Sequence, residues 1–63
     1  MPIAHINIME GRTGEQKEAM VAEVTAAISR TIGSPKENIR VLIHEVPKQN
    51  WGIGGTSAKK LGR

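Results

Sequence analysis

A single long helical stretch lies between two strand-like stretches, and this order does most to limit how the chain can fold. We expect a first strand over residues 3–9, a helix from about 14 to 32 and a second strand over 39–46. Strand, helix and strand in this order predict a βαβ unit with parallel strands and a right-handed crossover. One helix covers only one face of a two-stranded sheet, so the other face and the strand edges need a second subunit.

The predicted helix has sequence signals at both ends. Thr13 and Gln16 are spaced as a capping box, in which the hydroxyl accepts from the Gln16 N–H and the amide side chain reaches back. Gly33 is well placed for a left-handed C-cap. Between these signals the apolar residues recur at helical spacing and form one stripe: Met20, Val21, Val24, Ala27, Ile28 and Ile32.

Two shorter segments complete the α+β fold that we expect. Ser34 to Glu37 predict a short capped turn with Pro35 at its first helical position. Pro47 ends the second strand, because proline cannot donate a hydrogen bond to a β-ladder. The run Gly52-Ile53-Gly54-Gly55 then predicts a turn or a short hairpin, followed by a polar end.

The length of the chain argues for association of subunits. Residues 1–63 have room for one domain, and a domain this small buries too little surface to be stable without further support. The chain has no cysteine, and its two imidazoles, His5 and His44, form no zinc-type cluster, so we expect no disulfide and no metal. We therefore expect a homo-oligomer.

Charge and hydropathy limit the partners and the location that we expect. Nine Lys and Arg residues against six Glu residues leave a net charge of +3, which favours small anionic partners. No apolar run is long enough for a transmembrane helix, and the first residues lack the features of a secretion signal, so we expect a cytoplasmic protein without a membrane partner. A role in binding nucleic acid is disfavoured, because no aromatic residues interleave with the basic ones.

Pro2 is the residue with the most distinctive chemistry. If Met1 is removed, Pro2 becomes an N-terminal secondary amine, whereas with Met1 retained its nitrogen is an amide and cannot be a base. An ordinary α-amine has a pKa near 8, and burial and nearby cations lower such a value toward neutrality, where a general base works well. The alternative is that Pro2 is only a common second residue.

Arg12, Arg40 and Trp51 are the further candidates. Two guanidinium groups, each able to grip a carboxylate with two hydrogen bonds, suit a dicarboxylate, although either could be an ordinary surface charge. Arg40 lies near the start of the second strand and should lie at the Pro2 edge of the sheet, whereas Arg12 should lie more than ~20 Å away and serve Pro2 only from another subunit. Trp51, the only aromatic residue, could wall the site or simply pack.

In order and spacing, a set of short motifs resembles the 4-oxalocrotonate tautomerase family. The motifs are Pro2-Ile3-Ala4, Glu10-Gly11-Arg12, Glu15-Gln16-Lys17-Glu18, Ala27-Ile28-Ser29-Arg30, Arg40-Val41 and Gly52-Ile53-Gly54-Gly55. The resemblance implies one tautomerase domain, a βαβ fold with a C-terminal hairpin, and dimers assembled into a hexamer. It also implies cofactor-independent 1,3-proton transfer that converts 2-hydroxymuconate into 2-oxo-3-hexenedioate.

The resemblance also implies a role for each candidate residue. Pro2 matches the proline that moves the proton, and Arg12 matches the arginine after the first strand that binds the remote carboxylate. Arg40 matches an arginine that, in the family, comes from a neighbouring subunit, grips the carbonyl and near carboxylate, and stabilises developing oxyanion charge. Trp51 stands where the better-known members have Phe, which bears on the identity of the substrate. His5 and His44 receive no role.

Two alternative functions stay open at this point. Related enzymes hydrate or dehalogenate unsaturated acids with the same proline, and they usually recruit an extra carboxylate. The sequence has none at an obvious position, and Glu10 and Glu45 are the residues left open for that role. The other alternative is a small basic binding module without catalytic activity, whose affinity for nucleic acid would fall steeply with salt.

Overall fold

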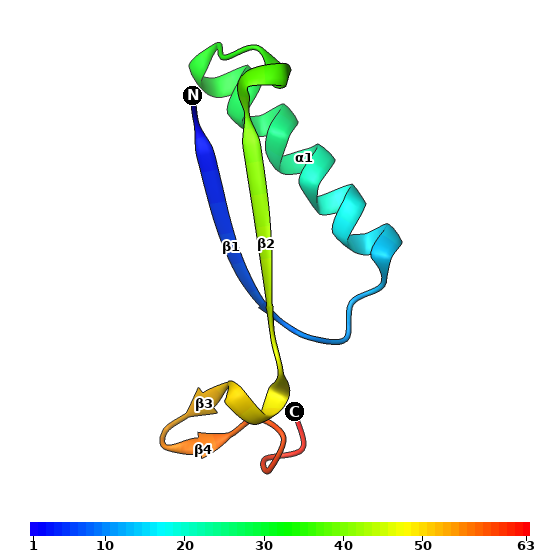
Figure 1. Ribbon diagram of the computed structural model, residues 1–63, viewed down its shortest axis with the longest axis vertical. Coiled ribbons are helices and arrows are strands. Elements are labelled where there is room, and N and C mark those ends of the chain that lie inside the picture. Colours follow the sequence, from blue (N-terminus) through cyan, green and yellow to red (C-terminus); the bar gives the residue numbers. More distant parts are fainter.

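The computed structural model describes all residues from 1 to 63 and has the predicted strand–helix–strand order (Figure 1). The elements are β1 (Ile3–Met9), α1 (Gly14–Ile32), the 3₁₀ turn η1 (Lys36–Asn38), β2 (Arg40–Val46), the 3₁₀ turn η2 (Lys48–Asn50), β3 (Gly52–Ile53) and β4 (Thr56–Ser57). The expected α+β class, with one βαβ unit and a C-terminal hairpin, is confirmed.

The sheet consists of β1 and β2 in parallel, with Ile3 opposite Arg40 and Met9 opposite Val46. Hydrogen bonds of 3.0 Å continue the ladder past both ends, from the Arg40 N–H to the Pro2 carbonyl and from the Glu10 N–H to the Val46 carbonyl. With only two strands, each strand keeps one edge without a partner, and such edges favour pairing with another chain.

Helix α1 begins and ends where its local signals predict. The Thr13 hydroxyl accepts from the Gln16 N–H at 3.1 Å, and the Gln16 side-chain oxygen Oε1 accepts from the Thr13 N–H at 3.0 Å. Gly33 has φ 72°, a left-handed conformation that costs glycine little, and its N–H donates to the Ser29 carbonyl. The apolar stripe is less complete than predicted, because Ile32 in the last turn is 65% exposed.

The segment between α1 and β2 corrects two predictions. Pro35 lies outside the 3₁₀ turn as its N-cap, rather than at the first helical position, and no side chain caps the turn. The second strand begins at Arg40 rather than Ile39, because the Ile39 N–H donates to the Lys36 carbonyl and closes the turn instead of joining the ladder. Ile39 is instead one of the best-buried residues, at 6% exposure.

The C-terminal segment forms the predicted hairpin at the end of the molecule away from Pro2 (Figure 1). Its two-residue loop, Gly54 and Gly55, has φ values of 58° and 91°, and a two-residue hairpin loop with positive φ at both positions favours glycine. The Glu10 carboxylate accepts from the Lys48 N–H at 3.1 Å, which ties this segment to the end of β1.

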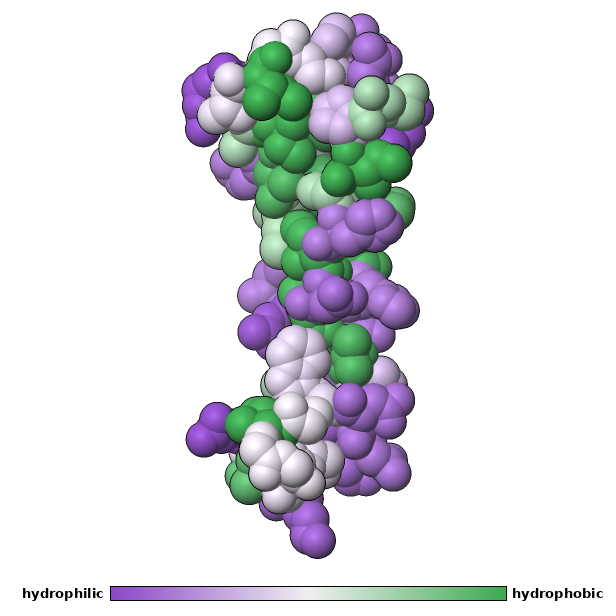
Figure 2. Space-filling model, turned by 90° about the vertical axis from the view of Figure 1, so that its left-hand side faces the viewer, coloured by the Kyte–Doolittle hydropathy of each residue, from purple (hydrophilic) through white to green (hydrophobic).

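The chain on its own buries very little. Only Ile39 and Ala58 are buried, and the radius of gyration is 14.6 Å, against about 11 Å for a compact domain of this length. Helix α1 covers one face of the sheet, chiefly over β2, while Ile3 and Leu42 on the opposite face are 55% and 50% exposed. Figure 2 views the side away from α1 and shows apolar surface concentrated in its upper half, with hydrophilic side chains interrupting it lower down. No helix of the chain has the length and apolar character needed to cross a bilayer.

Candidate active site

Pro2 is held at the start of β1 by the sheet itself. Its carbonyl accepts the hydrogen bond from the Arg40 N–H, and its side chain is partly exposed. Met1 precedes it and is exposed. In this form of the chain the Pro2 nitrogen is a tertiary amide without a basic lone pair, so the position acquires basic chemistry only after Met1 has been removed.

Arg40 lies beside Pro2, as the parallel register predicts. Its guanidinium nitrogen Nη1 donates to the Glu37 carbonyl at 2.8 Å and to the Ile39 carbonyl at 3.4 Å. No carboxylate neutralises this guanidinium, because the one ion pair of the chain lies elsewhere. A guanidinium has five N–H donors, so most of them are free to bind an anion. Pro2 and Arg40 together form what we call the proline end of the molecule.

Arg12 lies at the opposite end of the sheet, between β1 and the start of α1. It borders a groove of about 290 Å³ whose lining residues are Ile8, Arg12, Gln16, Lys17 and Met20. The apolar part of this groove comes from β1 and α1, and the polar part comes from Arg12 and the first turn of α1. Arg12 has no ion-pair partner within the chain, so its charge is available to an anion that enters the groove.

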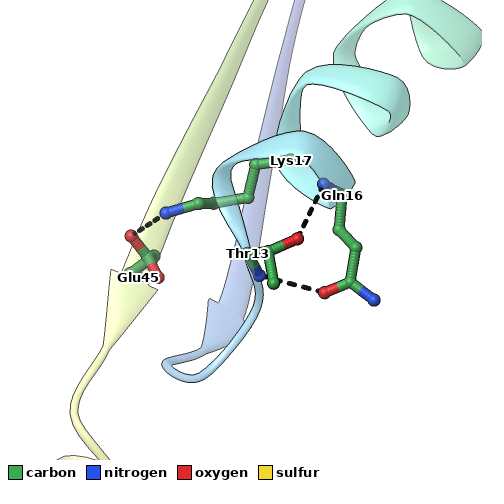
Figure 3. Close-up of polar contacts among 4 residues, drawn as sticks. All are labelled: Thr13, Gln16, Lys17 and Glu45. Carbon is green, nitrogen blue, oxygen red and sulfur yellow. Dashed lines mark hydrogen bonds and ion pairs between the residues drawn. The ribbon is translucent and has the colours of Figure 1, made fainter.

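The other two polar side chains of this groove each make a contact within the chain, as Figure 3 shows. Gln16 forms the capping box with Thr13, so its side-chain oxygen Oε1 accepts from the Thr13 N–H. The Lys17 ammonium donates to the Glu45 carboxylate at 2.8 Å, which joins α1 to the end of β2. Of the two cations that line the groove, only Arg12 is therefore unpaired. We call this region the Arg12 groove.

Trp51 lies beyond the end of β2, at the same end of the sheet as Arg12. It follows η2, is partly exposed, and its carbonyl accepts from the Ala58 N–H at 2.7 Å. Seven ladder positions at ~3.3 Å each separate this end from Pro2 by roughly 20 Å. One chain therefore brings Arg40 to Pro2 but keeps Arg12 and Trp51 away from both.

The two carboxylates considered for water activation both have partners. Glu10 binds the Lys48 N–H and Glu45 binds Lys17. His5 and His44 lie on the sheet face away from α1, and neither forms a hydrogen bond to another side chain. Sequence reasoning missed the Lys17–Glu45 pair, because 28 positions separate the two residues and no local spacing signals their contact.

Comparison with known proteins shows which family the chain resembles. The family model described as "Tautomerase enzyme" matches residues 2–61. A 2-hydroxymuconate tautomerase from Comamonas testosteroni is 56% identical over 63 residues, which are the whole of both chains. A solved structure from a study of the 4-oxalocrotonate tautomerase isozymes of Methylibium petroleiphilum has a TM-score of 0.93 and 61% identity, covering 98% of this chain and all of the other. A heterohexamer 4-oxalocrotonate tautomerase from Chloroflexus aurantiacus gives 0.91 at 34% identity, covering 97% and 98%.

Proposed function

The chain belongs to the tautomerase family and is an isomerase, and from this premise we propose that it converts 2-hydroxymuconate from its enol into its keto form. The observation that carries this proposal is the position of two unpaired arginines, one beside Pro2 and one in a groove at the opposite end of the sheet. A diacid with one carboxylate at each end suits two such cations once an assembly brings them together. The name 2-hydroxymuconate tautomerase of full-length relatives supports the choice of diacid.

In the proposed reaction Pro2 carries one proton. After Met1 is removed, the free amine takes the proton of the 2-hydroxyl group, and a proton is returned to the carbon chain as the enol becomes a ketone. Every bond change is a proton transfer accompanied by a shift of double bonds, so no other reactant is needed. A base whose pKa lies near neutrality suits both halves of this exchange.

In this proposal Arg40 and Arg12 bind the two carboxylates of the substrate, one each. Arg40 binds the carbonyl oxygen and the near carboxylate, where negative charge grows as the enol loses its proton, and preorganised donors at such a position lower the barrier. Arg12 binds the remote carboxylate, which keeps its charge throughout the reaction. Arg40 is thus expected to act on the chemical step and Arg12 on binding.

The complete site requires more than one copy of the chain. Arg12 and Trp51 can reach Pro2 only from another subunit, and we infer that the chain assembles as dimers into a hexamer. The exposed Ile3 and Leu42 on the open sheet face and the heterohexameric relative from Chloroflexus support this inference. Trp51 then forms an aromatic wall that excludes water from the amine. Activity therefore depends on assembly of the subunits.

The direct test is turnover of 2-hydroxymuconate by protein whose intact mass shows that Met1 is absent. We expect the conjugated enol to be consumed, which its ultraviolet absorbance measures. We also expect a pH–rate profile with one ionisation near neutrality. Processed, oligomeric protein that converts the enol no faster than buffer alone does would contradict the proposed function.

Arg12→Ala is expected to weaken substrate binding more than catalysis. A hydrogen bond to a charged group contributes about 1.5–3 kcal/mol, which corresponds to a rise in KM of roughly ten- to a hundredfold, with kcat changed much less. Steady-state kinetics on 2-hydroxymuconate measure both constants. Arg30→Ala, in the exposed last turn of α1, is the matched control and should resemble the wild type. An unchanged KM in Arg12→Ala would count against the role of the Arg12 groove.

Arg40→Ala is expected to lower kcat itself. Loss of one donor to a developing oxyanion typically costs about 10²–10³ in rate, and the near carboxylate loses a contact as well, so KM should also rise. The same assay and the same control apply. A variant with wild-type kcat and raised KM would show that Arg40 only binds substrate.

A further inference from the structure

The ion pair at the edge of the Arg12 groove has a consequence for the charge that the groove presents. Lys17 lies on α1 and lines the groove, and Glu45 lies near the end of β2. Their Nζ–Oε1 distance is 2.8 Å, and the two side chains are 29% and 38% exposed. The pair is therefore partly shielded from solvent. Its cation, Lys17, is the second of the two cations that line the groove.

Pairing changes what an anion in the groove encounters. With both cations free, the groove would present two positive charges to a ligand. The Glu45 carboxylate offsets the charge of Lys17, so the net charge of Arg12, Lys17 and Glu45 together is one positive charge. A single carboxylate carries one negative charge and matches this value, and electrostatic matching of this kind selects among partners.

We propose that Glu45 is a specificity-determining residue that limits the Arg12 groove to one effective positive charge, which fits a single carboxylate. This inference rests on the proposed function, because it concerns the remote carboxylate of the same substrate. Glu45 does not touch the reacting atoms and acts through Lys17. It controls how strongly the groove favours a diacid over an acid that lacks the remote carboxylate.

The test is a set of three variants, Glu45→Gln, Lys17→Gln and the double variant, each assayed on two substrates. One substrate is 2-hydroxymuconate, and the other is 2-hydroxypenta-2,4-dienoate, the same enol without the remote carboxylate. We expect Glu45→Gln to lower KM for the diacid several-fold, because it frees the Lys17 charge. Lys17→Gln should raise KM by a similar factor, and the double variant should return close to the wild-type value. The shifts should be smaller for the monoacid and should shrink in high salt.

A purely structural role for the ion pair predicts a different pattern. Both single variants break the same contact between α1 and β2, so both would then move KM in the same direction and to the same extent for the two substrates. That pattern, or unchanged KM values in both variants, overturns the inference while leaving the proposed function intact. Partly exposed ion pairs contribute little to stability, so the variants should fold, which circular dichroism and sedimentation can confirm. A wild-type protein inactive on the diacid overturns the proposed function and this inference together.

Discussion

Insertion of one alanine between Met1 and Pro2 is expected to abolish turnover without disturbing the fold. With a residue in front of it, the Pro2 nitrogen stays an amide and cannot accept the proton. A positioned general base typically contributes about 10²–10⁴ in rate, so we expect a loss in kcat of at least a hundredfold. Met1 is exposed in the chain, and the ladder uses the Pro2 carbonyl rather than its nitrogen, so an added residue has room.

The measurement combines intact mass, which reports the N-terminal residue, with kinetics on 2-hydroxymuconate. Protein with native processing is the matched control, and circular dichroism and sedimentation should not distinguish the two. Retained turnover in the extended protein would exclude Pro2 as the base, since no free amine remains at that position. If the extended form does not assemble, the lost activity is instead explained by the site's dependence on neighbouring subunits.

Leu42→Lys is expected to dissociate the oligomer and, as a consequence, to remove activity. Leu42 is half exposed on the sheet face that α1 leaves open, and it pairs in register with His5 on β1. An unpaired ammonium buried in an apolar interface costs several kcal/mol, and a symmetric assembly repeats that cost in every copy. The isolated chain cannot bring Arg12 to Pro2, so turnover should fall by at least a hundredfold.

Sedimentation velocity measures the mass of the assembly, and the kinetic assay measures its consequence. Ala22→Lys introduces the same charge at an exposed position of α1 and is the matched control, which should remain assembled and active. A Leu42→Lys protein that is fully active as a separate chain would show that one chain completes the site. A variant that stays assembled would show that this sheet face lies outside the interface.

The sequence by itself determined the elements of the fold, because their signals lie within a few residues of one another. The Thr13–Gln16 capping box and the C-cap at Gly33 involve contacts of three or four positions, and the structure contains both. The glycine pair of the C-terminal hairpin is an equally local signal. Where local signals compete, prediction is weaker: the closing hydrogen bond of η1 moved the start of β2 by one residue.

The sequence also placed Arg40 at the Pro2 edge of the sheet and Arg12 at the other, since parallel strands start at the same edge. Only the tertiary structure decided what surrounds these arginines. The 28-residue separation between Lys17 and Glu45 is bridged by the packing of α1 on β2, and no spacing rule predicts such a contact. The same packing determines which sheet face stays open, because a helix covers one face and leaves the other to a further copy of the chain.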